Sequence, residues 1–341
     1  MKDISQLHAW FEANQREFPW RINKNPYRVL VSEIMLQQTR ASVVVPYFEK
    51  WMELFPTLDA LANSSLEQVI KAWEGLGYYS RARRLHAAAI FIVQHFGGSF
   101  PETKEELIKI PGLGPYTVGA LLSFAFHKRA AAVDGNVARV LARYFLIEDS
   151  VQKAAVKRKL EGIAEQCLDE ETPWITAEAL IELGASLCSR KPKCEACPLQ
   201  GQCLGYQTGK AEYLPLQAPA PSVTSLFRSV FLIQVQGAIL VKKESAGRLM
   251  ADLYELPYVE KGREPSFVST SLPLVKHSFT RYVAHLTPYP LLFEKQSEAL
   301  SFLRQCGIVS PKAYIWVELS DLKHLPFSAG HRKILRHWMS A

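Results

Sequence analysis

Hydrophobic side chains recur at every third or fourth position over the first two hundred residues, and Pro, Gly, Asn or Asp stand in the gaps between these runs. This spacing places the apolar side chains on one face of a helix, and the gap residues are typical of helix ends. Helices are therefore predicted over residues 4–15, 26–38, 42–55, 80–96, 105–110, 116–126, 136–145, 154–167 and 175–188. The pattern predicts a mainly α-helical domain over residues 1–208.

The composition changes over residues 209–225, which are rich in Pro, Ala and Ser and predict an extended linker. After the linker the apolar runs are short and rich in β-branched and aromatic residues, as in strands. Strands are predicted over residues 225–235, 238–243, 274–280, 283–294 and 313–319, and helices over 297–306 and 329–339. We expect a second, smaller α+β domain over residues 226–341.

The length and charge of the chain indicate the number of domains, the kind of partner and the location in the cell. The 341 residues are enough for two domains, and 48% of them are hydrophobic. A net charge of +7 leans mildly toward polyanionic partners such as nucleic acid. The first helix lacks the apolar core of a signal peptide, and no apolar run is long enough to span a bilayer. We expect an intracellular, cytoplasmic protein that contacts no membrane and, without a heptad pattern, is a monomer.

Cysteines crowd near the end of the predicted helical domain. Four of the six lie within sixteen residues: Cys188, Cys194, Cys197 and Cys203. Disulfides are rare inside cells, so this crowding predicts a metal site. Four thiolates suit zinc or an iron–sulfur cluster; zinc sites usually show two close pairs, and only Cys194 and Cys197 form one here. The spacing leaves both metals open.

Residues 110–117, IPGLGPYT, interrupt a helical pattern with Gly112 and Gly114 and restart it at Pro115. A turn of this kind exposes backbone N–H groups beside a helix N-terminus, where a DNA phosphate can dock without any base being read. An ordinary turn between two helices has the same local pattern.

Together, this hairpin, the segment VDGNVARVLAR at residues 133–143 and the four cysteines resemble the helix-hairpin-helix DNA glycosylases related to endonuclease III. The segments SEIMLQQT at 32–39 and GLGYYSRARRL at 75–85 are similar to the MutY-type adenine DNA glycosylases. The resemblance implies a six-helix part of about 25–132, an iron–sulfur part of 1–24 and 133–208, and one [4Fe–4S] cluster at the four cysteines. The family has six residues between its first two cysteine ligands, whereas five stand between Cys188 and Cys194.

Excision of adenine needs an acid that protonates the base and a carboxylate that stabilises the sugar cation. The resemblance assigns the first role, at adenine N7, to Glu33 and the second to Asp134, which could otherwise be a simple helix cap. Burial is expected to keep Glu33 protonated, and hydrogen bonds to keep Asp134 ionised. Asn136 would orient Asp134 or the attacking water. Tyr116 stands where strand-cleaving relatives carry a Schiff-base lysine, so the resemblance implies a monofunctional enzyme that leaves an abasic site.

The resemblance also implies contacts with duplex DNA, because a base must leave the stack before its glycosidic bond can be reached. Four residues are expected at the flipped site, as wedge and as contacts to the base opposite: Gln37, Gln38, Thr39 and Tyr78. On its own, Tyr78 could equally be a core ring. The resemblance places three residues near the adenine pocket: Trp20, Arg21 and Glu178. Without the resemblance, Trp20 could equally be a core ring, and Arg21 and Glu178 could be surface charges.

In MutY-type enzymes a Nudix-like C-terminal domain recognises 8-oxoguanine opposite the adenine. The glutamate-rich metal box of Nudix hydrolases is absent from this sequence. The resemblance therefore implies a lesion reader and no hydrolase in this domain. The Phe-Ser-His loop of the family best matches Phe279, Thr280 and Arg281.

The sequence thus predicts an adenine DNA glycosylase of base excision repair, associated with the nucleoid and acting on double-stranded DNA that contains 8-oxoguanine:adenine or guanine:adenine pairs. Two alternatives stay open. An endonuclease III-like glycosylase with lyase activity is disfavoured by Tyr116. A non-catalytic iron–sulfur protein that binds DNA or senses redox state is disfavoured by Glu33 and Asp134, because binding alone needs neither acid.

Overall fold

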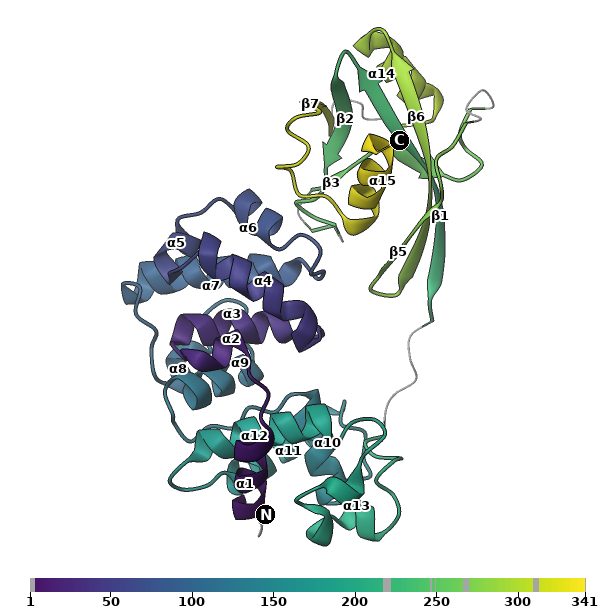
Figure 1. Cartoon of the computed structure of the whole chain (residues 1–341). Helices are drawn as coiled ribbons and strands as arrows, with labels where there is room; N and C mark the ends of the chain where they lie inside the picture. The colour runs from purple at the N-terminus through teal and green to yellow at the C-terminus, as the bar shows by residue number, and fades with distance from the viewer. Residues whose placement is uncertain are drawn as a thin grey trace. The chain divides into compact units, whose positions relative to one another are not determined.

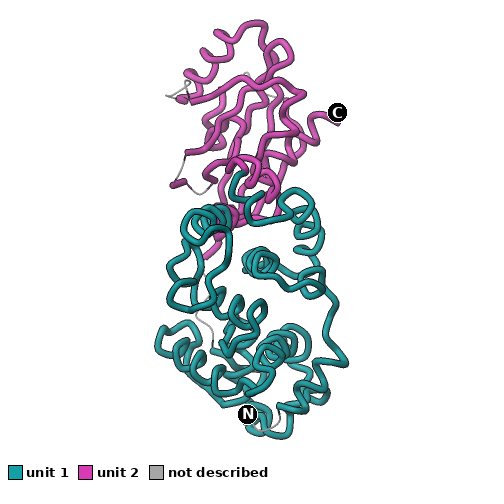
Figure 2. The backbone as a smooth tube through the Cα atoms, turned by 90° about the vertical axis from the view of Figure 1, so that its left-hand side faces the viewer, with its two compact units in different colours: residues 1–63, 84–219 teal, residues 64–83, 220–341 magenta. Residues whose placement is uncertain are grey.

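The computed structural model describes residues 4–216, 222–245, 247–248, 250–265, 270–308 and 313–340. The chain forms two compact units, one of residues 1–63 and 84–219, the other of residues 64–83 and 220–341 (Figure 2). Residues 217–221 of the predicted linker lie outside the described residues. No helix in the described ranges is long and apolar enough to cross a membrane.

The first unit is helical, as the periodicity predicts (Figure 1). Its helices are α1 (Ile4–Asn14), α2 (Pro19–Ile22), α3 (Pro26–Leu36), α4 (Ala41–Leu54), α5 (Leu58–Ala62), α7 (Ser80–Phe96), α8 (Lys104–Leu107), α9 (Pro115–Ala120), α10 (Gly135–Tyr144), α11 (Ala154–Cys167), α12 (Pro173–Ser186) and α13 (Leu204–Gln207). A π-helical turn, Leu121–Ala125, continues α9. Each predicted helix is confirmed. The unpredicted ones, α2, α5 and α13, are four or five residues long, too short to show a helical period.

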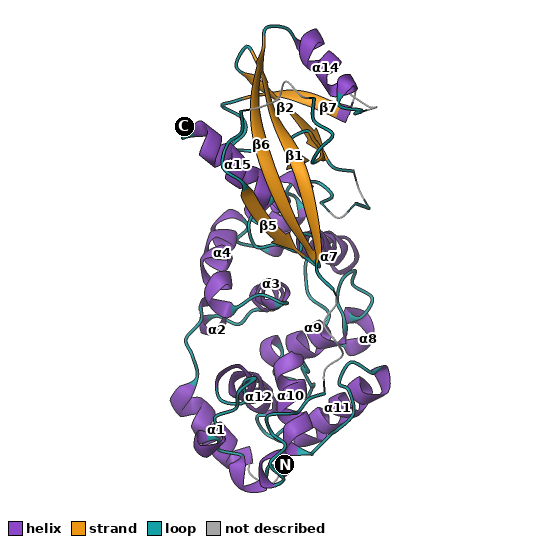
Figure 3. Ribbon diagram, turned by 90° about the vertical axis from the view of Figure 1, so that its right-hand side faces the viewer, coloured by secondary structure: helices purple, strands orange, loops and turns teal. Residues whose placement is uncertain are grey.

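Helices from both ends of this unit share one core. Leu7 of α1, Leu141 of α10, Leu160 of α11 and Leu183 of α12 are buried in the same apolar cluster, and the four helices lie together in Figure 3. Gly184 lets α12 approach α10 closely, because a Cβ there would lie 2.8 Å from the backbone oxygen of Asn136. The chain segment before the cysteines is thereby fixed against the segment that carries Asp134.

The predicted hairpin joins α8 to α9. Gly112 adopts φ 85° and packs against Arg84, whose Cβ would stand 2.6 Å from an added Cβ, so this position requires glycine. Gly114 has an extended backbone with φ −97° and caps α9, with open space around it. Only one of the two glycines is therefore demanded by backbone geometry.

The second unit contains a mixed seven-stranded sheet. Its strands are β1 (Thr224–Val235), β2 (Ala238–Lys243), β3 (Tyr254–Glu255), β4 (Tyr258–Glu260), β5 (Val275–Phe279), β6 (Tyr282–Phe293) and β7 (Tyr314–Glu318). The order is β3-β2-β1-β6-β5, with β4 paired to β1 and β7 to β2. β1 and β6 run parallel, and the other pairs are antiparallel. The predicted strands are confirmed, whereas β3 and β4 are too short to show an alternation.

Two helices of this unit, α14 (Gln296–Gln305) and α15 (Ala329–Met339), cover opposite faces of the sheet (Figure 3). Alternate residues of β1 explain this: Phe231 packs in one cluster with Phe302 of α14, and Leu232 in another with Leu335 of α15. The predicted α+β class is therefore confirmed as a mixed sheet with helices.

Residues 64–83, which include α6 (Leu66–Ala72), belong to the second unit. Glu74, just after α6, accepts a hydrogen bond from Arg332 of α15 at 2.5 Å. Arg83 donates to Asp252 at 3.1 Å. These ion pairs tie the start of the loop 74–79 and the first turn of α7 that follows it to the C-terminal part of the chain.

Candidate active site

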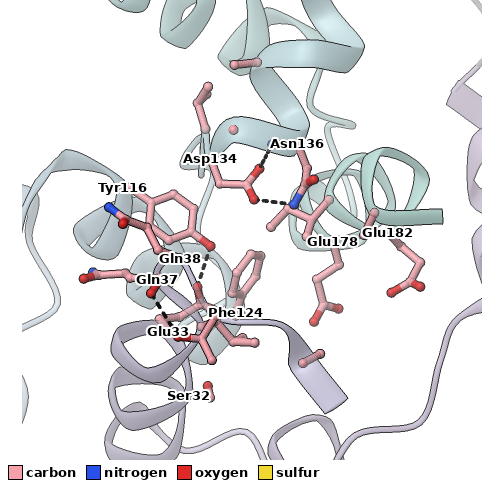
Figure 4. Close-up of a pocket in the computed structure, with 18 of the residues that line it drawn as sticks. Ser32, Glu33, Gln37, Gln38, Tyr116, Phe124, Asp134, Asn136, Glu178 and Glu182 are labelled. Carbon is pink, nitrogen blue, oxygen red and sulfur yellow. Dashed lines mark hydrogen bonds between the residues drawn. The ribbon is translucent and has the colours of Figure 1, made fainter. Parts of the chain in front are cut away.

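A cleft of about 1310 Å³ opens in the first unit (Figure 4). Its walls come from α2, α3, the start of α9, the start of α10, and α12. The cleft brings together the residues predicted as catalytic, those predicted for the adenine pocket, and the glutamines and threonine after α3: Glu33, Tyr116, Asp134, Asn136, Trp20, Arg21, Glu178, Gln37, Gln38 and Thr39. Residues that are far apart in the sequence thus line the same cleft.

Glu33 lies on α3, a helix with apolar neighbours on nearly every side, and is only 7% exposed. The hydroxyl of Tyr116 donates a hydrogen bond to its Oε2 at 2.5 Å. Burial raises the pKa of Glu33 to about 7, assisted by the charges of Asp134 and Glu178 and opposed by the Tyr116 hydrogen bond and by Arg21. Glu33 can therefore hold a proton near neutral pH and donate it, as a general acid must.

Asp134 caps the N-terminus of α10. Its Oδ1 accepts the backbone N–H groups of Asn136 at 2.9 Å and Val137 at 2.8 Å, and its Oδ2 accepts the Asn136 side-chain amide at 2.7 Å. Burial nevertheless outweighs these hydrogen bonds, and the net shift of the Asp134 pKa is upward. The upward direction alone does not protonate the carboxyl, so the ionised state of Asp134 stays a prediction.

Arg139, which was not predicted from the sequence, orients Asn136. Its Nη2 donates to Asn136 Oδ1 at 2.8 Å and to the Gly184 carbonyl at 2.7 Å, and its Nε donates to the Cys188 carbonyl at 2.7 Å. The Asn136 amide oxygen is thus occupied by Arg139, which leaves its NH₂ for Asp134. One sequence signal existed: Arg139 follows Asn136 by three residues and shares its face of α10.

Ion pairs connect α2 and the segment that follows it to α12 at the wall of the cleft. Lys24 meets Glu178 at 2.7 Å, and Arg21 meets Glu182 at 2.8 Å. Glu178 is 8% exposed, so it is not the surface charge that its residue type alone suggests. Glu182 was not predicted from the sequence. It stands one helical turn after Glu178 on an otherwise apolar helix, a spacing that signals a shared face.

The four predicted metal ligands surround one cavity of about 30 Å³: Cys188, Cys194, Cys197 and Cys203. Burial raises the pKa of Cys197 to about 11, and neighbouring thiols add to this. Four thiolates there need a cationic centre, so the donor set fits a thiolate-bound metal group. Arg143 of α10 donates to Cys188 Sγ at 3.3 Å and to the Ser189 carbonyl at 2.6 Å, and so supports the cysteine loop. Among the described side chains, no three His, Cys, Asp or Glu groups converge closely enough to hold a single metal ion.

The remaining predicted residues do not line the cleft. Tyr78 belongs to the second unit, has φ 50°, and is 45% exposed, which does not fit a buried core ring. Gly112 and Gly114 form the α8–α9 turn. Phe279 ends β5, and Thr280 and Arg281 form the two-residue turn to β6, where Thr280 adopts φ 48°.

Comparison with known families agrees with this geometry. Residues 31–166 match the model of the HhH-GPD superfamily of base excision DNA repair proteins, and residues 189–203 match the iron-sulfur binding domain of endonuclease III. A thermostable thymine-DNA glycosylase is similar in structure, with a TM-score of 0.54 and 28% identity over 60% of this chain and 95% of that one. The fold and the cleft define a helix-hairpin-helix DNA glycosylase with an iron–sulfur binding domain.

Similar proteins identify the branch of this superfamily to which the chain belongs. The human Adenine DNA glycosylase is 41% identical over 61% of this chain, which spans 40% of the length of that relative. The Adenine DNA glycosylase of Buchnera aphidicola subsp. Baizongia pistaciae is 32% identical over 83% of this chain and 82% of its own length. The chain belongs to the adenine DNA glycosylase family.

Proposed function

We propose that this adenine DNA glycosylase, which hydrolyses N-glycosidic bonds in base excision repair, removes adenine paired with 8-oxoguanine or guanine and leaves the strand uncut. The observation that carries the proposal is the buried Glu33, hydrogen-bonded to Tyr116 in a cleft that also holds Asp134. A protonated carboxyl beside a second carboxylate supplies the proton and the negative charge that the reaction needs.

The reaction begins when Glu33 donates its proton to N7 of a flipped adenine. The bond between N9 and the sugar then breaks, its electron pair goes to the base, and neutral adenine leaves. Asp134, held by Asn136, stabilises the positive charge that develops on the sugar. Water adds to the sugar carbon and passes a proton to the Glu33 carboxylate, which restores the acid. Tyr116 stays neutral, because burial raises its pKa well above the ordinary value, and it holds Glu33 in place.

Strand cleavage is not part of this proposal. A lyase of this class uses an amine that attacks the sugar and forms a Schiff base. Tyr116 occupies the corresponding position, and a phenol cannot form that adduct. The product is therefore an intact strand with an abasic site.

The DNA contacts follow from the same resemblance. Gln37, Gln38 and Thr39 enter the duplex at the flipped site from the cleft, and Tyr78, half-exposed on its loop, acts as wedge. The turn at Gly112 and Gly114 binds a backbone phosphate through its N–H groups. The protein acts as a monomer in association with the nucleoid.

The cysteine loop holds one [4Fe–4S] cluster. Support comes from the four thiols around one cavity and from the iron-sulfur family match, which begins directly after Cys188. When bound, the cluster neutralises four thiolates and stabilises the loop. Arg143 donates to the carbonyls of Ser189 and Arg190 and so supports the segment 189–193, which is one residue shorter than in the family.

The helical catalytic domain covers residues 1–208, and residues 226–341 form a Nudix-like domain that reads 8-oxoguanine. Support for a reader comes from the exposed turn at Thr280 and Arg281. Thr280→Ala should reduce the preference for adenine opposite 8-oxoguanine over guanine. An unchanged preference would exclude this turn as the reader.

The decisive experiment is a single-turnover assay on duplexes with adenine opposite 8-oxoguanine, guanine or thymine, read with and without alkali. We expect cleavage only after alkali, and fastest opposite 8-oxoguanine. Strand breaks without alkali would establish a lyase instead, and no adenine release by cluster-loaded protein would leave a DNA-binding role.

A further inference from the structure

Two arginines meet one buried carboxylate at the wall of the cleft. Glu182, on α12, is 1% exposed. Its Oε2 accepts a hydrogen bond from Arg21 Nη2 at 2.8 Å, and its Oε1 accepts one from Arg16 Nε. Arg21 also donates from Nη1 to the backbone carbonyl of Arg16 at 2.8 Å. A buried carboxylate is costly unless it is paired, and here both arginines pair with it.

The two arginines in turn hold an aromatic stack. Their guanidinium groups lie over the ring of Phe18, Arg16 at 5.1 Å and Arg21 at 5.3 Å from its centroid. Phe18 stacks on Trp20, with the ring centroids 4.7 Å apart and the planes 12° from parallel. Both rings line the cleft. Glu182 therefore fixes, through the arginines, the surface against which a planar base would lie.

Charge gives Glu182 a second effect. The titratable groups that act on Glu33 are Tyr116, Asp134, Glu178 and Arg21. Of these, Arg21 is the cation, and a nearby cation favours the ionised form of a carboxyl. The two other cations of this wall are paired with carboxylates, Lys24 with Glu178 and Arg16 with Glu182. The carboxylate of Glu182 offsets Arg21 and thereby protects the protonated form of Glu33.

We propose that Glu182 is a positioning residue for base excision: it anchors Arg16 and Arg21 on the Phe18–Trp20 stack and offsets the charge of Arg21 near Glu33. This inference rests on the proposed role of Glu33 as the acid. A residue that only packed α12 would affect the rate equally at every pH.

The test is the pH dependence of single-turnover adenine release by Glu182→Gln in the full-length, cluster-loaded protein. The pH above which the rate falls should lie about half a unit lower than in wild type. At pH 8 this displacement alone should make the variant about threefold slower than wild type. The exposed Glu12 on α1 provides the matched control, and Glu12→Gln should reproduce the wild-type profile.

Two further variants keep the test independent of how well Glu182→Gln folds. Arg21→Met should move the alkaline fall to higher pH than in wild type, and Arg21→Met combined with Glu182→Gln should cancel the displacement seen in Glu182→Gln alone. Normalised profiles of wild type and Glu182→Gln that superimpose would overturn the inference, even if the rates differ. Failure of the wild-type protein to release adenine would instead overturn the proposed function.

Discussion

Replacing Glu33 by glutamine should abolish adenine release and yet stabilise the protein above neutral pH. Burial raises the pKa of Glu33 from 4.5 to about 7. The folded state therefore binds the proton more tightly than the unfolded state, and wild-type stability falls as pH rises from about 4.5 to about 7. A shift of this size costs about 3 kcal/mol once the carboxyl is ionised, at about 1.4 kcal/mol per pKa unit.

Glutamine has the shape of the neutral acid, and its carbonyl oxygen can accept the Tyr116 hydrogen bond, but it cannot ionise. At pH 5 the free energy of unfolding of Glu33→Gln should therefore lie close to that of wild type. At pH 8 the variant should be more stable by up to about 3 kcal/mol. The stability that the wild-type protein loses as the pH rises is the cost of keeping an acid in an apolar site, a trade between activity and stability.

The measurement is urea denaturation at pH 5, 6, 7 and 8, followed by far-ultraviolet circular dichroism, with Glu12→Gln as the control for loss of one exposed carboxylate. The control should show no such dependence on pH. A stability difference between Glu33→Gln and wild type that is the same at pH 5 and pH 8 would refute the reasoning, because it would show that Glu33 is not protonated by burial.

Three further predictions concern the supports of the cleft and of the loop 74–79. Gly184→Ala should slow adenine release at least about tenfold and cost about 1–3 kcal/mol of stability, because the added Cβ would lie 2.7 Å from Asn136 Cβ. Gly162→Ala, in open space on α11, should instead keep the rate, and equal effects of the two variants in kinetics and denaturation would contradict this account. Arg139→Met should lower both the rate and the visible absorbance of the cluster, since it removes donors from the asparagine and from the cysteine loop; unchanged values would exclude that link. Arg332→Met should speed amide hydrogen exchange in residues 74–79, and unaltered exchange would show that the α15 contact does not hold the loop.

The sequence alone determined the secondary structure and the chemical inventory. Periods of three to four and of two residues located the longer helices and strands, because apolar side chains must face a core wherever those elements form. The hairpin, the acids and the cysteine group were recognisable as motifs, since each is a contiguous pattern of residues. Some short elements escaped, such as the two-residue β3 and the seven-residue α6, because they hold less than two periods.

Only the tertiary structure decided how these residues act together. Tyr116 reaches Glu33 across 83 positions, and Lys24 reaches Glu178 across 154. Neither contact leaves a local trace in the chain. The raised pKa of Glu33 likewise depends on burial by distant helices and on charges from three other segments. Local patterns are encoded by neighbours in sequence, whereas the proton affinity of a buried acid is set by everything that packs around it.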